Sequence, residues 1–279
     1  MKIERVEAIP IRIPLGRVFS GSSYAVDSRA TVITRVHAAG GLVSEVHNGD
    51  DRAHGAAIAR IIEREIAPLV IGEDIHAYER IWERLFRITI ARSERALAMR
   101  AIGCVDTAIW DLIGMALNIS VCKLLGGYRD RLPIIAIAGY YFPGKRAEEL
   151  APEMAWLRSL GMAGCKVKVG GLSPEEDATR VRFARAGGGA DFLLAVDANR
   201  GWSVAEAIRF ARLVEPHGIA WFEEPCHWHD DVRGMAEVRR ATSIPVSAGQ
   251  SEVTAAGVRR PLDAAAVDIV NFDALEGAG

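Results

Sequence analysis

The chain has 279 residues, of which half are hydrophobic and a quarter are charged, and this composition is typical of a globular protein with a substantial core. The formal net charge of −2 provides no broad basic field, so nucleic acids and anionic membranes are not expected as partners. No apolar run reaches membrane-spanning length, and the four scattered cysteines include no CxxC pair. We therefore expect a cytoplasmic protein with reduced cysteines.

Residues 1–123 are predicted to form an α+β domain. Three strands and three amphipathic helices are expected, at 3–13, 30–37 and 42–47 and then at 51–69, 77–88 and 94–117. Between the first two strands, residues 16–29 are rich in glycine and serine and contain Tyr24. This segment is either a mobile flap over a ligand or an ordinary surface loop. His47 follows the third strand, and a substrate contact and a structural role are equally open for it.

Residues 124–279 alternate between short apolar strands and helices. The expected strands are 134–138, 165–169, 192–196, 219–222, 245–248 and 267–272, and the expected helices are 145–160, 174–187, 203–215, 231–241 and 252–260. This alternation predicts right-handed βαβ units and a parallel sheet, either doubly wound or curved into a (β/α)8 barrel. No Gly-x-Gly-x-x-Gly motif follows the first strand, so nothing favours a dinucleotide-binding fold.

The strand predicted at 165–169 carries Lys166 and Lys168, whose side chains share a face because side chains alternate along a strand. Lysine is otherwise rare in this chain, since it occurs only at positions 2, 123, 145, 166 and 168. A partly buried lysine can lose its proton, whereas arginine cannot, and two neighbouring ammonium groups lower each other's pKa. Taken alone, the pattern fits either a proton-abstracting base or an edge strand with solvated lysines.

Polar side chains lie at the C-terminal end of each barrel strand from the second onward: Lys166 and Lys168, Asp197 and Asn199, Glu223, Gln250 with Glu252 nearby, and Asp273. In a barrel all these ends face one mouth, where the active site lies. Helix capping explains a single carboxylate at a strand end, but it does not explain a series on successive strands. We therefore favour a TIM-type (β/α)8 barrel. Oxygen ligands that converge without histidine or cysteine favour a hard cation, Mg²⁺ or Mn²⁺.

Five motifs together resemble those of the enolase superfamily, in its mandelate-racemase-like branch: Lys166-Val167-Lys168, Val196-Asp197-Ala198-Asn199, Phe222-Glu223-Glu224-Pro225, Pro245-Val246-Ser247-Ala248-Gly249-Gln250 and Asn271-Phe272-Asp273. The resemblance covers the whole chain, because that family has an α+β capping domain before its barrel. It implies that Lys168 is a base whose pKa is lowered by Lys166, and that Asp197 and Glu223 bind the metal. It also implies that Asp273 pairs with a histidine after the next strand; an acid here favours the racemase-like branch over the muconate-lactonizing branch, which has lysine.

The resemblance implies removal of the proton next to a substrate carboxylate, with the divalent ion stabilising the enediolate that forms. The enediolate then either loses a β-hydroxyl group, as in a dehydratase, or is reprotonated, as in a racemase or epimerase. We expect an acid-sugar (aldonate or aldarate) dehydratase, because the small polar flap and residues 47–50 suit a hydroxylated substrate. The alternatives are a racemase or epimerase of a 2-hydroxy acid or related carboxylate, and a non-catalytic remnant of the fold.

Tyr24, His47 and Asn199 are the expected substrate contacts, and the chain is expected to form a homo-oligomer. His227 and His229 follow the Glu223-Glu224-Pro225 motif and either line the mouth or lie on its rim.

The chain departs from the family pattern in two respects. The family's third metal ligand is a glutamate after the glycine, and here that position holds Gln250, whose amide oxygen can bind Mg²⁺ without adding charge. Glu252 lies on the same face if the backbone stays extended, and charge balance favours it; Glu224 is expected to hydrogen-bond to a neighbouring strand end. The sequence also stops after the sixth predicted strand, so two strands and the histidine partner of Asp273 are expected to be missing.

Overall fold

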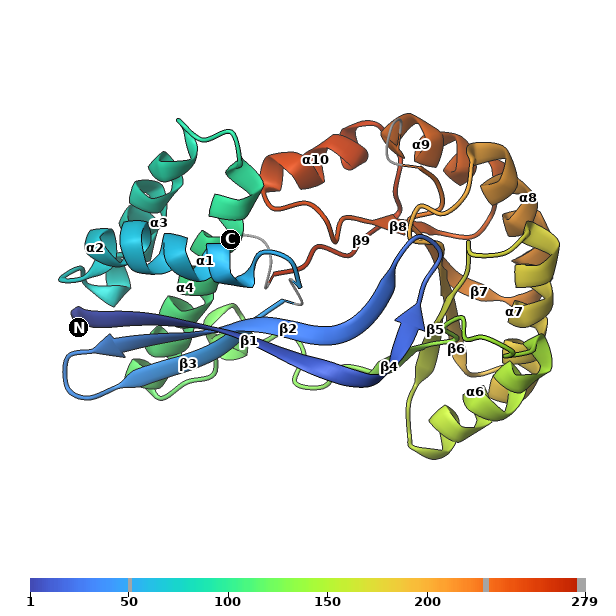
Figure 1. The fold of residues 1–279 in the computed structure, drawn as a ribbon, viewed down its shortest axis with the longest axis horizontal. Coiled ribbons are helices and arrows are strands. Elements are labelled where there is room, and N and C mark those ends of the chain that lie inside the picture. The colour runs from blue at the N-terminus through green and yellow to red at the C-terminus, as the bar shows by residue number, and fades with distance from the viewer. Residues whose placement is uncertain (50–51, 228–230, 275–279) are drawn as a thin grey trace.

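The structure is a computed structural model that describes residues 1–49, 52–227 and 231–274. Within these residues the strands form two sheets, an antiparallel sheet of order β1-β2-β3 and a parallel sheet of order β4-β5-β6-β7-β8-β9. Figure 1 shows the first sheet and its helices on one side of the molecule, the curved second sheet on the other, and β1 and β2 running between them. A capping domain followed by part of a barrel is therefore confirmed. The boundary between residues 123 and 124 remains a prediction.

The first sheet consists of β1 (Ile3–Ser20), β2 (Ala25–Ala38) and β3 (Val43–Asn48). β1 and β2 pair from Ile3 opposite Ala38 to Ser20 opposite Ala25, with an irregularity between Pro14 and Phe19. The prediction that 16–29 is a loop or flap is therefore wrong for most of its length. Pairing along a long hairpin overrides the weak strand propensity of glycine and serine, and only residues 21–24 form the turn.

Three helices contact this sheet, α1 (Gly55–Ile61), α2 (Ala67–Val70) and α4 (Arg95–Leu117), and two more, α3 (Tyr78–Phe86) and α5 (Val121–Leu124), pack against α4. The single helix expected at 51–69 is interrupted by a π-helical turn, Ile62–Ile66, which precedes Pro68. Proline has no N–H to donate to the preceding turn, and a widened turn before it accommodates this loss. The central helix α4 packs against β2 and β3 and buries Ile102, Ile109 and Leu112.

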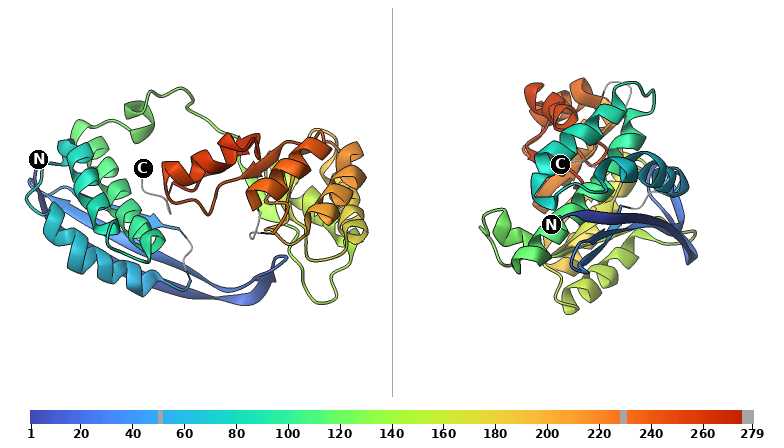
Figure 2. Two further views of the ribbon diagram at one scale, coloured as in Figure 1. Left: turned by 90° about the horizontal axis from the view of Figure 1, so that it is seen from above. Right: turned by 90° about the vertical axis from the view of Figure 1, so that its left-hand side faces the viewer.

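The second sheet contains β4 (Ile135–Ala138), β5 (Gly164–Lys168), β6 (Leu193–Asp197), β7 (Ile219–Glu223), β8 (Val246–Ala248) and β9 (Ile269–Val270). Between them lie α6 (Leu150–Ser159), α7 (Pro174–Gly188), α8 (Val204–Val214), α9 (Asp231–Ala241) and α10 (Ala255–Asp263). Figure 2 shows these helices on the outer side of the strands. The last strand is shorter than expected, and β4 and β9 each have one neighbour among the described strands.

Two of the barrel helices begin as the sequence predicts. Ser173 and Ser203 accept hydrogen bonds from the backbone of the third helical residue, and Glu176 and Glu206 accept bonds from the backbone of the capping serines. These capping boxes fix where the loops after β5 and β6 turn into helices. None of the described helices is long and apolar enough to cross a membrane.

The tip of the β1–β2 hairpin rests on the ends of the barrel strands. Ser22 donates a hydrogen bond to the Ala198 carbonyl (Oγ–O distance 2.6 Å), just after β6. The Tyr141 N–H donates to the Ser20 carbonyl at 3.0 Å, so the chain after β4 also contacts the tip. The Phe19 ring packs edge-on against Tyr140, with ring centres 5.3 Å apart. The hairpin is therefore an ordered arm that reaches from the capping domain to the barrel.

Candidate functional site

The site begins with the two lysines of β5, a strand in which every residue is buried. Cys165 and Val167 point into the core between the sheet and its helices, and alternation places Lys166 and Lys168 on the opposite face. The two lysines are 8% and 5% exposed, which contradicts a solvated edge strand. The prediction that they share one face of a buried strand is confirmed.

The next two strands place carboxylates beside these lysines. Parallel pairing puts Lys168 next to Asp197 and Asp197 next to Glu223, so one row of residues crosses β5, β6 and β7. Lys168 Nζ lies 2.6 Å from Asp197 Oδ2, and Lys166 Nζ lies 3.2 Å from the same oxygen and 2.5 Å from Glu223 Oε1. Asp197 is fully buried and Glu223 is 2% exposed, so the four charges balance one another away from bulk water.

The electrostatics of this row differ from the sequence-based expectation. Burial lowers the pKa of Lys168, but the attraction of Asp197 and its hydrogen bond outweigh burial, and the net pKa is raised. The pKa of Lys166 is also raised, because Asp197 and Glu223 together outweigh burial and the repulsion from Lys168. Lys168 does lower the pKa of Lys166 by repulsion, as expected, but the carboxylates outweigh it, so neither lysine pKa moves toward neutrality in this arrangement. Each ammonium group has a carboxylate in direct contact, and the sequence does not show that.

The two carboxylates respond in opposite directions. Burial raises the pKa of Asp197, but the two lysines outweigh it and the pKa is lowered. The pKa of Glu223 is raised, because burial and the neighbouring Asp197 outweigh the contact with Lys166.

Asn199 lies at the turn after β6, with a backbone φ of 44°. Its side-chain oxygen accepts a hydrogen bond from Lys168 Nζ at 2.9 Å, and its N–H donates to Asp197 Oδ1 at 2.9 Å. Asn199 also lines the cavity described below, as expected for a substrate contact. In this structure, however, its side chain is bonded to Lys168.

A second row of polar groups follows at the ends of β6, β7 and β8. Glu224 is 1% exposed, and its carboxylate contacts Arg200 Nη2 at 2.8 Å and accepts from Gln250 Nε2 at 2.8 Å. Burial outweighs the attraction of Arg200 and raises the pKa of Glu224 to about 7. The expectation that Glu224 hydrogen-bonds to a neighbouring strand end is confirmed, since Gln250 follows β8.

Glu252 does not join this cluster. The Glu252 N–H donates to the Gly249 carbonyl at 3.0 Å, so the chain turns directly after β8 instead of staying extended. The Glu252 carboxylate contacts Arg260 on α10 at 3.4 Å, away from Gln250 and Glu224. The preference for Glu252 over Gln250 as a metal ligand therefore rested on a backbone conformation that the chain does not adopt.

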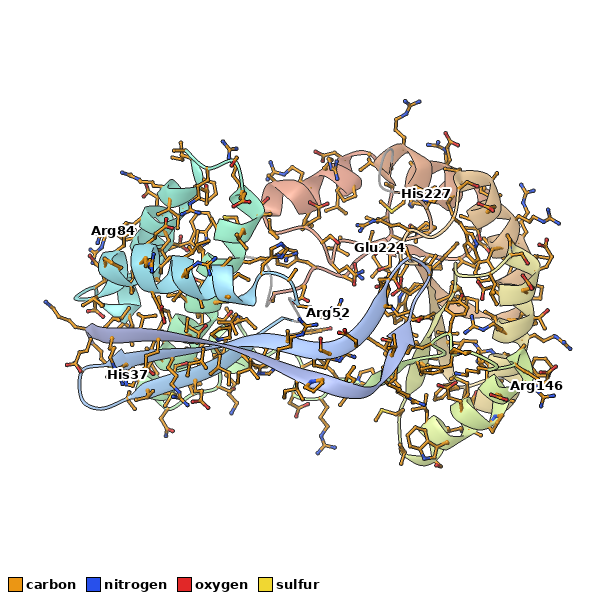
Figure 3. All side chains as sticks on the ribbon, viewed as in Figure 1. His37, Arg52, Arg84, Arg146, Glu224 and His227 are labelled. Carbon is orange, nitrogen blue, oxygen red and sulfur yellow. The ribbon has the colours of Figure 1, made fainter. Side chains whose placement is uncertain are left out.

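A cavity of about 750 Å³ lies between the hairpin tip and these strand ends. Its described lining residues are Ser23, Tyr24, Val26, Arg29, Arg52, Tyr140, Lys168, Asn199, Arg200, Glu224, His227, Gln250 and Ser251. In Figure 3, Glu224 and His227 lie on the barrel side of the cavity and Arg52 lies toward the capping domain. This lining includes four basic residues, Arg29, Arg52, Lys168 and Arg200; Lys168 contacts Asp197 and Arg200 contacts Glu224, and guanidinium groups are the side chains that bind carboxylate ligands best.

Several predicted contacts can now be placed. Tyr24 reaches the cavity from the hairpin, and Lys168 Nζ lies 5.6 Å from the centre of its ring. Burial outweighs Lys168 and raises the pKa of Tyr24. His47 is exposed on β3 and is not among the described lining residues, and neither is Asp273, which follows β9. His227 lines the cavity, whereas His229 lies outside the described residues.

Sequence reasoning missed the contribution of Ser22, Arg200 and Tyr140. Arg200 adopts a φ of 61°, which a sequence does not reveal; Ser22 reaches the site through docking of the hairpin, and Tyr140, after β4, lines the cavity and packs against Phe19 of the hairpin. Arg200 directly follows the Asp197-Ala198-Asn199 motif, and this proximity was the one available signal.

The donor set fits a hard divalent cation. Lys166 Nζ already lies between Asp197 and Glu223, which shows that the two carboxylates converge on a position where a cation is stabilised. Among the described residues, no group of three histidine, cysteine or acidic side chains gathers at one point. The converging donors are therefore two carboxylates, Asp197 and Glu223, and carboxylate oxygens are ligands that Mg²⁺ and Mn²⁺ prefer.

Comparisons with known proteins agree with this geometry. Residues 7–126 match the family model for the mandelate racemase / muconate lactonizing enzyme N-terminal domain, and residues 149–279 match the enolase C-terminal domain-like model. D-galactarolactone cycloisomerase of Agrobacterium fabrum is 31% identical over 98% of this chain and 71% of its own length. The chain belongs to the enolase superfamily, in its mandelate racemase-like group. Members of this superfamily that resemble the chain are enzymes, and they include sugar-acid dehydratases, cycloisomerases and epimerases.

The chain is also similar to a curated dehydratase and to a crystal structure that contains magnesium. Arabinonate dehydratase of Saccharolobus solfataricus is 33% identical over 83% of this chain, which spans 62% of that protein's length. The crystal structure of a mandelate racemase/muconate lactonizing enzyme from a marine actinobacterium, in complex with magnesium, is 43% identical. It superimposes with a TM-score of 0.90 over 100% of this chain and 74% of its own.

Proposed function

We propose that the protein abstracts the proton next to a substrate carboxylate with the assistance of Mg²⁺, and that it acts as an acid-sugar dehydratase. The observation that carries this proposal is the row of Lys168, Lys166, Asp197 and Glu223, which is buried and linked by contacts of 2.5 to 3.2 Å. Such a row holds a potential base beside a divalent-cation site. Mn²⁺ is an alternative ion, because the same oxygen donors bind it.

In this proposal Asp197 and Glu223 hold the metal, with the Gln250 amide as the third protein donor. When bound, the metal supplies positive charge to the substrate carboxylate, which makes the neighbouring proton more acidic. The amide brings no charge of its own, so the chain contributes two negative charges to the ion.

Lys168 is proposed as the group that takes the proton at its Nζ atom. To do so it must be neutral, and the contact with Asp197 opposes this, because that contact raises the Lys168 pKa. Engagement of Asp197 with a cation would weaken its hold on Lys168. Lys166, which lies two residues from Lys168 on the same face of β5, would then favour the neutral form of Lys168 through repulsion.

The remaining cavity residues support a polyhydroxylated anion as the substrate. Ser23, Tyr24, Asn199 and Ser251 offer hydroxyl and amide groups, and the basic side chains described above offer positive charge. These groups match an aldonate or aldarate. A racemase or epimerase of a 2-hydroxy acid remains the second candidate, because both reactions begin with the same proton abstraction. For that reaction Asp273 is proposed to act on the opposite face with a histidine partner.

Deuterium exchange tests the proposal. The protein is incubated in D₂O with Mg²⁺ and a library of sugar acids, and the substrate is followed by NMR. Exchange of the proton next to the carboxylate, with loss of water from at least one acid, is the expected result. If metal binds but no acid shows exchange or product, the chain is a non-catalytic member of the fold. Exchange without dehydration selects the racemase or epimerase.

A further inference from the structure

A cluster of three residues bonds to the backbone around Lys168. It consists of Tyr141, which follows β4, and of Asp177 and Arg180 on the first turns of α7. Asp177 is fully buried and Arg180 is 5% exposed. None of the three is among the described residues that line the cavity, so the cluster cannot touch a substrate there.

Arg180 joins the ends of two strands. Its Nη1 atom donates to the Lys168 carbonyl at 2.9 Å, and its Nη2 atom donates to the Gly139 carbonyl. Lys168 is the last residue of β5 and Gly139 directly follows β4. The rigid guanidinium fork therefore fixes the peptide from which the Lys168 side chain extends.

Asp177 holds both Arg180 and the chain beyond Lys168. Its Oδ1 atom accepts from Arg180 Nη1 at 2.6 Å, and its Oδ2 atom accepts from the Gly170 N–H at 2.8 Å. Gly170 adopts a φ of +90°, and a Cβ atom there would lie 2.7 Å from the Ala198 carbonyl oxygen. The segment after β5 is therefore locked between Asp177 and the end of β6.

Tyr141 connects this cluster to the hairpin of the capping domain. Its hydroxyl donates to Asp177 at 2.8 Å and accepts from the Gly171 N–H at 3.0 Å. The Arg180 guanidinium lies 4.2 Å from the centre of the Tyr141 ring, and the Tyr141 N–H donates to the Ser20 carbonyl at the hairpin tip. Tyr141 thus contacts both the docked hairpin tip and the Asp177–Arg180 pair that bonds to the backbone around Lys168.

The geometry points to Arg180 as the positioning residue for Lys168, held in place by Asp177 and Tyr141. This inference rests on the proposed role of Lys168 as the base. A base must approach the proton that it removes with an accuracy of a fraction of an ångström, and a misplacement of about 1 Å can cost about 10²-fold in rate. Because Arg180 acts on the backbone of Lys168, its loss changes the rate and leaves substrate affinity in place.

The test compares two arginines of one helix. Arg180→Lys keeps the positive charge beside Asp177 but loses the fork that bridges two carbonyls. Arg185→Lys is the matched control, because Arg185 also donates to several carbonyls but does so at the opposite end of the strands, to His217 at 2.8 Å and Phe192 at 2.6 Å. Arg180→Lys is expected to lower kcat by about 10- to 100-fold with KM and Mn²⁺ affinity within about twofold of wild type. Arg185→Lys is expected to leave all three unchanged.

A second readout does not depend on activity. The chain has lysines only at positions 2, 123, 145, 166 and 168, so labelling with [13Cε]lysine gives five resonances, and Lys168→Arg assigns one of them. Each arginine-to-lysine variant adds one resonance, which makes the two comparable. We expect the Lys168 resonance to shift in Arg180→Lys and to stay in place in Arg185→Lys.

An unmoved Lys168 resonance in Arg180→Lys, or an equal shift in Arg185→Lys, would overturn the inference even if no substrate is ever found. A failure of the proposed function alone would show as a wild type without proton exchange, while the resonance still moves. If Arg180→Lys does not fold, Tyr141→Phe decides the matter. It keeps the ring and removes only the hydroxyl, and it must shift the Lys168 resonance for the inference to stand.

Discussion

The two ends of the barrel strands use the same kinds of residues in different ways. At the N-terminal end, charged side chains hydrogen-bond to the backbone. Arg185 donates to carbonyls, Glu215 accepts from the Ser243 N–H at 2.8 Å, and Asp268 accepts from the Val246 N–H at 3.0 Å. At the C-terminal end, Lys166, Lys168, Asp197 and Glu223 contact one another beside a cavity. The charges at the N-terminal end therefore stabilise loops, whereas these four at the C-terminal end converge beside a cavity and form the candidate site.

Among the variants that test this difference between the two ends, Lys168→Ala is expected to have the largest effect on activity. Loss of a positioned general base costs about 10²- to 10⁴-fold, so proton exchange in D₂O should fall to the background rate. Lys145→Ala is the control, because Lys145 also pairs with a carboxylate, Glu153 at 2.6 Å, but is not among the described lining residues of the cavity. Wild-type exchange rates in Lys168→Ala would remove Lys168 from the role of base.

Arg185→Lys should have the opposite effect: it should lower stability and leave proton exchange unchanged. Arg185 makes several hydrogen bonds to carbonyls at the N-terminal ends of β6 and β7, and a lysine cannot replace them all. We expect the free energy of unfolding to fall by about 1–2 kcal/mol, as measured by urea denaturation. Proton exchange per folded molecule should not change, and a slower exchange would mean that the two ends of the strands are not independent.

Glu215→Gln should have the smallest effect. The Ser243 N–H and the Thr242 and Ser243 hydroxyls stabilise the Glu215 carboxylate and lower its pKa. A carboxylate whose pKa is lower in the folded state stabilises the fold above its unfolded pKa of about 4.3, and this contribution is lost as the pH falls through the folded value. We expect the variant to lose no more than about 0.5 kcal/mol at pH 7, because solvent screens this partly exposed carboxylate, and to show a weaker acid dependence of unfolding. Equal losses at pH 3 and pH 7 would contradict the assignment.

The sequence predicted the parts of the site that depend on periodicity. Alternation along β5 places Lys166 and Lys168 on one face, and strand-helix alternation brings Asp197 and Glu223 to the same edge. Both features follow from local geometry and from the parallel arrangement of the strands. The order of the barrel elements was predictable for the same reason, whereas the family assignment came from the resemblance of five short motifs.

Features that depend on long-range contact were not predictable. Residues 16–29 look like a loop because of their glycine and serine content, and they become a hairpin through pairing along β1 and β2 and docking on the barrel. The direction of the lysine pKa changes depends on which charged group lies closest to each lysine. That is set by the pairing of three strands, β5, β6 and β7. The turn from Gly249 to Glu252 is fixed by a backbone hydrogen bond, which the residue types at these positions do not predict.

Binding of Mn²⁺ is the most direct test of the central claim that Asp197 and Glu223 form a cation site at the C-terminal ends of the strands. Electron paramagnetic resonance counts free Mn²⁺ in titrations of the wild type, Asp197→Asn and Asp268→Asn. Asp268 is the matched carboxylate, because it lies at the other end of the strands with Arg239 as its partner at 2.8 Å. We predict one site per chain in the wild type and in Asp268→Asn, and its loss in Asp197→Asn. No binding by the wild type, or equal binding by Asp197→Asn, would contradict the account.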